Sequence, residues 1–243
     1  FEVYYQPKVN INEQKLCGCE ALVRWFRNGK MVSPMEFIPV LESEGTICTL
    51  DFYVLDKVCQ AIKSWIDRDI KPVRVSSNFS KVHLKNPALA DRIFAVIDKY
   101  GIDPQYIEIE LTEMSGYDNY ENLAQFIKDM KERGVHTSID DFGTGYSSLN
   151  LLTDLDVDTV KLDKSYSIRL DDNEEKTKIL IRNIVNMVHD LGFKVIAEGV
   201  ETDEQAKFLR EIGCSTVQGY LYDKPLPLGE FEKRLEREFV YQK

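Results

Sequence analysis

The chain has 243 residues, of which 43% are hydrophobic and 30% charged, and its formal net charge is −10. This composition is typical of a globular protein long enough to bury a substantial core. The acidic balance argues against binding polymeric nucleic acid through a basic surface. No apolar run reaches the length of a transmembrane helix, so we expect a cytoplasmic domain without membrane contact. Because the chain begins at Phe1 rather than Met, we expect residues 1–243 to be a single domain excised from a longer protein.

Short β-rich segments alternate with amphipathic helical segments along the chain. Two strands are predicted first, over Val3–Val9 and Leu16–Trp25, and two helices follow, over Pro34–Glu44 and Thr49–Arg68. Further strands are expected at 73–79, 106–112, 135–140, 159–163, 193–197 and 216–221, and further helices at 87–100, 120–133, 147–152, 174–191, 203–212 and 228–239. Repeated βα units indicate a parallel sheet, and this many units favour its closure into an α/β barrel.

Polar residues stand at the C-terminal ends of the predicted strands. In an α/β barrel these ends converge on one face, where active sites are built. The two-residue period of a strand turns Glu110, Asp140 and Lys161 towards the barrel axis, because their apolar neighbours face the surrounding helices. The full set is Asn78, Glu110, Asp140, Asp141, Lys161, Asp163, Glu198 and Gln218.

Several carboxylates at one barrel mouth would repel one another unless they were protonated or neutralised by cations. Carboxylates and an amide oxygen, without cysteine or histidine at the strand ends, favour Mg²⁺ or Mn²⁺. The adjacent Asp140 and Asp141 could bridge two ions, since Gly143 would let the strand end turn and aim both carboxylates inward. Paired ions of this kind are the usual arrangement for phosphodiester hydrolysis.

The segment Glu20-Ala21-Leu22 and its continuation Val23-Arg24-Trp25 resemble the signature of EAL-type cyclic di-GMP phosphodiesterases. The resemblance extends over nearly the whole chain. It includes the motifs at 5–7, 78–80, 110–113, 140–149, 161–163, 197–202 and 218–220. It implies a modified TIM-type (β/α)8 barrel in which one early strand is antiparallel to the rest.

The resemblance also implies a ligand set for the metal ions. Glu20, Asn78, Glu110 and Asp140 would hold one cation, and Asp140 would bridge to a second that Asp141 also helps to bind. Two ions, Mg²⁺ or Mn²⁺, are therefore expected.

Further roles follow from the same resemblance. Glu198 is expected to bind or deprotonate the attacking water, with Lys161 as its orienting partner. Substrate contacts are expected from Gln6, Leu22, Arg24 and Gln218, with Arg24 at a phosphate and Gln218 also supporting the water and metal shell. Supporting or loop positions are expected at Glu113, Asp163 and Glu201, and Glu113 would anchor the loop Phe142–Leu149.

The implied activity is hydrolysis of cyclic di-GMP to linear pGpG by in-line attack of metal-activated water on one phosphodiester. A homodimer is expected, and the full-length chain would carry a regulatory sensor or GGDEF domain. Two alternatives stay open. The domain could be a catalytically silent cyclic di-GMP receptor, or Lys161 could form a Schiff base as in aldolases.

Overall fold

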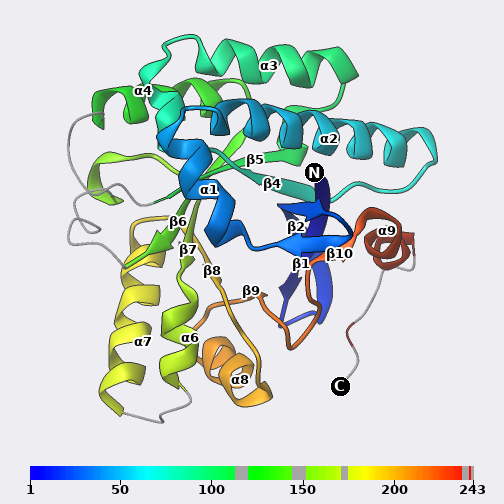
Figure 1. Ribbon diagram of the computed structural model, residues 1–243. Helices are drawn as coiled ribbons and strands as arrows, with labels where there is room; N and C mark the ends of the chain where they lie inside the picture. Colours follow the sequence, from blue (N-terminus) through cyan, green and yellow to red (C-terminus); the bar gives the residue numbers. More distant parts are fainter. Residues whose placement is uncertain (113–119, 144–151, 171–174, 237–240, 242–243) are drawn as a thin grey trace.

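The structure is a computed structural model that describes residues 1–112, 120–143, 152–170, 175–236 and 241. Its centre is a closed barrel of eight strands, in the order β1-β9-β8-β7-β6-β5-β4-β2, which the pairing of β1 with β2 completes (Figure 1). These strands are β1 (Glu2–Asn10), β2 (Lys15–Arg27), β4 (Arg74–Asn78), β5 (Ile107–Thr112), β6 (His136–Phe142), β7 (Thr159–Leu162), β8 (Lys194–Ala197) and β9 (Thr216–Gln218).

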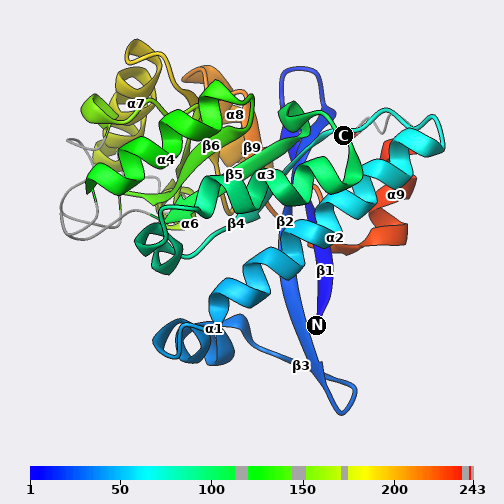
Figure 2. The same cartoon turned by 90° about the horizontal axis from the view of Figure 1, so that it is seen from above.

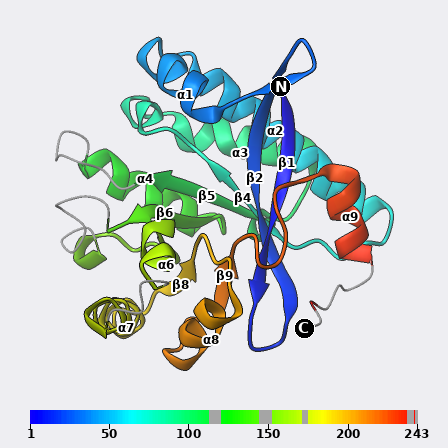
Figure 3. The same ribbon diagram turned by 60° about the horizontal axis from the view of Figure 1, so that its bottom comes forward.

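One strand of this barrel runs against the others. β1 is antiparallel to both of its barrel neighbours, β2 and β9, whereas the six pairings from β2 round to β9 are parallel. The prediction of a modified barrel with one early antiparallel strand is therefore confirmed. The reversal places the start of β1 at the end of the barrel where the other strands finish (Figure 3).

Helices surround the barrel (Figure 1). They are α1 (Pro34–Ser43), α2 (Ile47–Asp67), α3 (Leu89–Tyr100), α4 (Tyr120–Glu132), α6 (Lys164–Leu170), α7 (Glu175–Asp190), α8 (Asp203–Glu211) and α9 (Leu228–Glu236), with short 3₁₀ turns at Lys81–Lys85 and Pro104–Tyr106. An apolar stripe of α2, from Leu50 to Trp65, is buried and packs on the outer face of the sheet. The core thus lies between the barrel and its helices, which leaves the barrel interior to polar side chains.

Two short strands were not predicted. β3 (Lys30–Val32) forms a hairpin with the end of β2, and β10 (Leu226–Pro227) pairs with β1. Asn28 and Gly29 both have positive φ, 51° and 74°, as a two-residue hairpin turn requires. Figure 2 shows β3 and α1 extending beyond the barrel near the N-terminus. Most of the helix predicted at 147–152 lies outside the described residues.

Candidate active site at the barrel mouth

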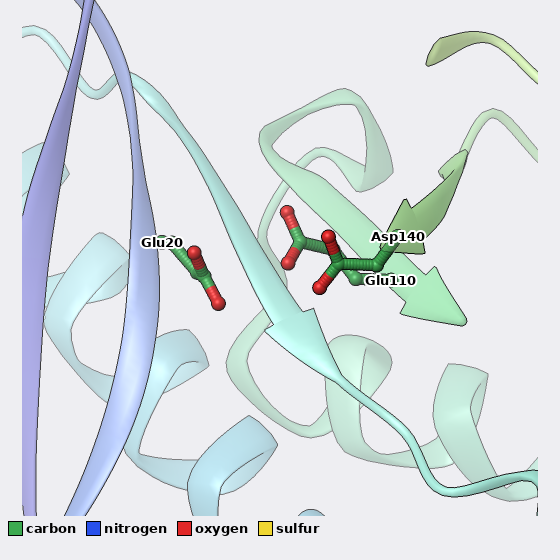
Figure 4. A group of neighbouring side chains, drawn as sticks. All are labelled: Glu20, Glu110 and Asp140. Carbon is green, nitrogen blue, oxygen red and sulfur yellow. The ribbon is translucent and has the colours of Figure 1, made fainter. Parts of the chain in front are cut away.

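Three buried carboxylates from three different strands meet at the C-terminal end of the barrel. Glu20 of β2, Glu110 of β5 and Asp140 of β6 are 5%, 0% and 8% exposed. One oxygen of each lies within 4.8 Å of the others. Figure 4 shows the three side chains pointing towards one another across the barrel. The convergence of Glu110 and Asp140, predicted from strand ends and side-chain alternation, is present in the structure, and Glu20, expected only from the family resemblance, joins them.

Lys161 of β7 lies at the centre of this group and is fully buried. Its Nζ is 2.7 Å from Glu110 Oε2, 2.7 Å from Glu198 Oε1, 3.1 Å from Asp140 Oδ1 and 3.4 Å from Glu20 Oε2. Burial alone would lower the pKa of Lys161, but these carboxylates outweigh it and raise the pKa well above its ordinary value. A permanently protonated lysine is a poor nucleophile for a carbonyl group, so the geometry disfavours the Schiff-base alternative.

Two amide side chains complete the surroundings of Glu20. Asn78, the last residue of β4, donates its Nδ2 to Glu20 Oε1 at 2.7 Å. Gln218, the last residue of β9, donates its Nε2 to Glu20 Oε2 at 2.6 Å and to Gln6 Oε1 at 3.2 Å. The Oε1 atom of Gln218 is buried without a hydrogen-bond partner among the described residues. The mouth therefore presents an unused oxygen acceptor beside the carboxylates.

The chain turns sharply at the paired aspartates. Asp141 itself has a positive φ of 55°, and the pairing of β6 with β7 is irregular between Ile139 and Phe142. The Asp141 backbone N–H donates to Asp140 Oδ1 at 2.9 Å. One carboxylate oxygen each of Asp140, Asp141 and Glu198 lie within 4.8 Å of one another. Gly143 was predicted to allow this turn; its φ is 92°, but the left-handed conformation already begins at Asp141.

Charge at the mouth is unbalanced. Lys161 faces four carboxylates, those of Glu20, Glu110, Asp140 and Glu198, and burial together with mutual repulsion raises the pKa of Glu20 and of Asp140. The same causes raise the pKa of Glu198 to about 8. A bound divalent cation would supply the missing positive charge. The carboxylates and amide oxygens suit Mg²⁺ or Mn²⁺, so the residues present fit such an ion.

A cavity of about 300 Å³ opens beside the carboxylates. Leu22 and Arg24, two of the positions predicted to contact the substrate, line it together with Asn78 and Asp141. Arg24 is half-buried, donates its Nη1 to Val23 O at 2.9 Å, and lies 6.0 Å from the centre of the Tyr4 ring. Gln6 is 8% exposed at the same end of the barrel.

The remaining predicted residues differ in their placement. Asp163 is half-buried just after β7 and accepts a hydrogen bond from Ser165 N at 3.0 Å, so it caps α6. Its negative charge is also one of the causes that raise the pKa of Asp141, after burial. Glu201 is exposed, and its backbone N–H donates to Gln205 Oε1. Glu113 and most of the loop 142–149 lie outside the described residues.

Sequence reasoning gave no role to Lys8, a second buried lysine inside the barrel. Lys8 is 5% exposed, and its Nζ is 2.9 Å from Glu110 Oε1 and 3.3 Å from Glu108 Oε1. A signal for it was present, because the alternation of β1 puts Lys8 on the same face as Gln6. Together the two lysines outweigh the effect of burial and lower the pKa of Glu110 to about 2.

A closed barrel with polar side chains from many strands at its C-terminal mouth places the chain in the class of α/β-barrel proteins. The match to the EAL domain family model covers residues 1–225, and the chain belongs to that family. The cyclic di-GMP phosphodiesterase NbdA of Pseudomonas aeruginosa is 36% identical over 235 residues, which are 96% of this chain and 30% of that protein. The probable cyclic di-GMP phosphodiesterase PdeB of Escherichia coli is 35% identical over 236 residues, 97% of this chain and 44% of that protein.

A solved structure of the PaMucR phosphodiesterase in complex with c-di-GMP is also similar. It superposes with a TM-score of 0.87 at 30% identity and covers 94% of this chain and 93% of that one. The chain spans between 27% and 44% of the length of the curated relatives. Within the described residues, none of the helices combines the length and apolar character needed to cross a membrane.

Proposed function

We propose that this domain hydrolyses cyclic di-GMP to linear pGpG. The observation that carries the proposal is the convergence of four carboxylates from four different strands or strand ends on the buried Lys161 at the mouth of an EAL-type barrel. The relatives named as cyclic di-GMP phosphodiesterases support the same substrate.

Two divalent cations, Mg²⁺ or Mn²⁺, are proposed as cofactors. Glu20, Asn78, Glu110 and Asp140 would hold one of them, and Asp140 and Asp141 would hold the second. When bound, such ions stabilise charge on the phosphodiester oxygens and lower the pKa of water.

The chain's own residues provide the remaining chemistry. Glu198 lies at the mouth on the side of the paired aspartates, and its raised pKa suits a group that accepts a proton from water. Lys161 holds Glu198 at 2.7 Å and so fixes the direction of this carboxylate. Water attacks the phosphorus and gives a proton to Glu198, the bond from phosphorus to the 3′ oxygen breaks, and the 3′ oxygen takes up a proton, so that the single linear product carries a 5′-phosphate and a 3′-hydroxyl.

Binding of the dinucleotide involves the cavity beside the carboxylates. Leu22 supplies apolar contact, and Arg24 can release its bond to Val23 O and donate to a phosphate. Gln6 and Gln218 are hydrogen-bonded to each other, Gln218 also contacts Glu20, and the two amides would orient the substrate together. For the intact protein we propose a homodimer and an additional sensor or GGDEF domain, and the cytoplasmic location stays a prediction.

The test is incubation of the purified domain with cyclic di-GMP in the presence of Mg²⁺, Mn²⁺ or EDTA, with products resolved by chromatography. Formation of pGpG that needs the metal and is lost in Glu20→Ala supports the proposal. Glu121→Ala, on the exposed start of α4, is the matched control and should behave as the wild type. Binding of cyclic di-GMP without any product would identify a receptor, and neither binding nor product would refute the assignment.

A further inference from the structure

Lys8 enters the barrel from the reversed strand β1, one inward position below Gln6. It pairs in register with Gly18 of β2. The stem of Lys8 lies over this glycine, where an added Cβ would be 3.8 Å from Lys8 Cδ and only 3.1 Å from Arg74 O. The missing side chain at Gly18 leaves room for a long residue to cross the barrel interior.

The ammonium group of Lys8 has an acceptor for each of its three N–H donors. These acceptors are Ser76 Oγ at 2.8 Å, Glu110 Oε1 at 2.9 Å and Glu108 Oε1 at 3.3 Å. Burial makes this arrangement costly to break, because an unpaired charge would then be left in the interior. The position of the ammonium group is therefore fixed by its surroundings.

Glu110 is held by two lysines, one at each oxygen. Oε1 accepts from Lys8, which otherwise contacts Ser76 and Glu108 at the level below the mouth. Oε2 accepts from Lys161, whose other contacts are carboxylates of the mouth. The two oxygens of one carboxylate are thus directed to two different levels of the barrel.

This inference rests on the proposed function. We propose that Lys8 is a positioning residue for the metal ligand Glu110: by holding Oε1 below the mouth, it orients the carboxylate so that Oε2, which Lys161 also contacts, faces the other carboxylates of the mouth, where a divalent cation would bind. Lys8 does not act on the substrate. Lys8 and Glu108 line a separate cavity of about 380 Å³, which Arg74 and Lys194 also border. Arg74 and Lys194 are the first residues of β4 and β8, and the other ends of these two strands form the mouth.

The competing explanation is purely structural. Lys8 also neutralises Glu108, which is 3% exposed, and a variant without the lysine would leave that carboxylate buried and uncompensated. A single substitution of Lys8 confounds the two explanations. Removing both partners, in Lys8→Met/Glu108→Gln, restores the charge balance of this pair but not the bond to Glu110 Oε1.

The experiment measures two quantities for the wild type, Lys8→Met, Glu108→Gln and the double variant. These are the thermal midpoint in EDTA and the dissociation constant for Mn²⁺, followed by the electron paramagnetic resonance signal of the free ion. We expect Lys8→Met to lower the midpoint and to weaken Mn²⁺ binding at least about tenfold, as losses of residues that orient metal ligands do. Glu108→Gln should bind Mn²⁺ as the wild type does.

The double variant decides between the explanations. Recovery of the thermal midpoint without recovery of Mn²⁺ affinity supports a positioning role, and a lower kcat at nearly unchanged KM for cyclic di-GMP would agree with it. Recovery of both quantities, or wild-type Mn²⁺ affinity in Lys8→Met, overturns the proposal. The outcome for the proposed function is separate, because it depends on whether the wild type forms pGpG and not on these affinities.

Discussion

Replacing Lys161 by Met removes the positive charge that four buried carboxylates share. Methionine has a similar length, so the change deletes the ammonium group and little of the packing. Glu110 and Glu198 each lose a contact of 2.7 Å, and Asp140 and Glu20 lose contacts of 3.1 and 3.4 Å. Removing one partner of a buried ion pair costs about 3–5 kcal/mol. At about 2–4 °C per kcal/mol for a chain of this size, the melting temperature in EDTA should fall by about 6–20 °C.

Divalent ions should reverse much of this loss. Saturation with a divalent ion at about 1,000 times its dissociation constant adds about 4 kcal/mol to the free energy of unfolding. Differential scanning calorimetry with EDTA and with Mn²⁺ would measure both effects. Lys128→Met is the control, since this exposed lysine of α4 lies 3.9 Å from Glu132 and its loss should change stability by less than about 0.5 kcal/mol. If Lys161→Met melts at the same temperature as the wild type in EDTA, the four carboxylates cannot be both charged and close to one another, and the reasoning would be refuted.

Three further changes have defined outcomes. Glu198→Gln should lower kcat by about 10²–10⁴-fold, as loss of a general base does, while calorimetric binding of cyclic di-GMP is retained; full activity would exclude Glu198 as the base. Gly219→Ala should cost at least about 3 kcal/mol in thermal unfolding, because the new Cβ would lie 2.0 Å from Val200 O, whereas Gly229→Ala has nothing within 4 Å and should be neutral or stabilising. Asp158→Asn should cost about 1–2 kcal/mol at pH 7, because His136, with its Nδ1 3.3 Å from Asp158 Oδ1, and the hydrogen bond from the Thr137 backbone outweigh burial and lower the pKa of Asp158. A carboxylate with a lowered pKa stabilises the fold at pH values above its ordinary pKa of 3.8. This stabilisation is lost as the pH falls through the lowered pKa, so the difference in stability between the wild type and Asp158→Asn should shrink below about pH 4. A difference that does not depend on pH would contradict this.

Much of the site could be predicted because strand alternation is a local rule. Once Glu110, Asp140 and Lys161 are assigned to parallel strands, their side chains must face the axis and their strand ends must meet. The antiparallel direction of β1 could not be derived in this way. It depends on pairing with both β2 and β9, at the two ends of the chain, and only the resemblance to a known family indicated it.

Other features depended on contacts that no local pattern contains. The left-handed backbone at Asp141 is coupled to an irregular pairing between β6 and β7, so its position follows from the neighbouring strand. Lys8 illustrates the opposite case. The inward direction of its side chain follows from alternation with Gln6. Its role at the site depends on its hydrogen bond to Glu110, which is 102 residues away in the chain. The hairpin at Asn28 and Gly29 was also within reach of sequence rules and was not predicted.

The reversed direction of β1 also has a mechanical consequence. Phe1 stacks on Trp25 with ring centres 5.6 Å apart, and its carbonyl accepts a hydrogen bond from Tyr53. Five residues later β1 carries Gln6 into the mouth, where it pairs with Glu20 of β2, and from Lys8 onwards the strand also pairs with β9. A pull on the chain at Phe1 along the strand axis would load these backbone ladders in shear and displace Gln6 relative to Glu20. The first strand therefore connects tension at Phe1 directly to the geometry of the barrel mouth.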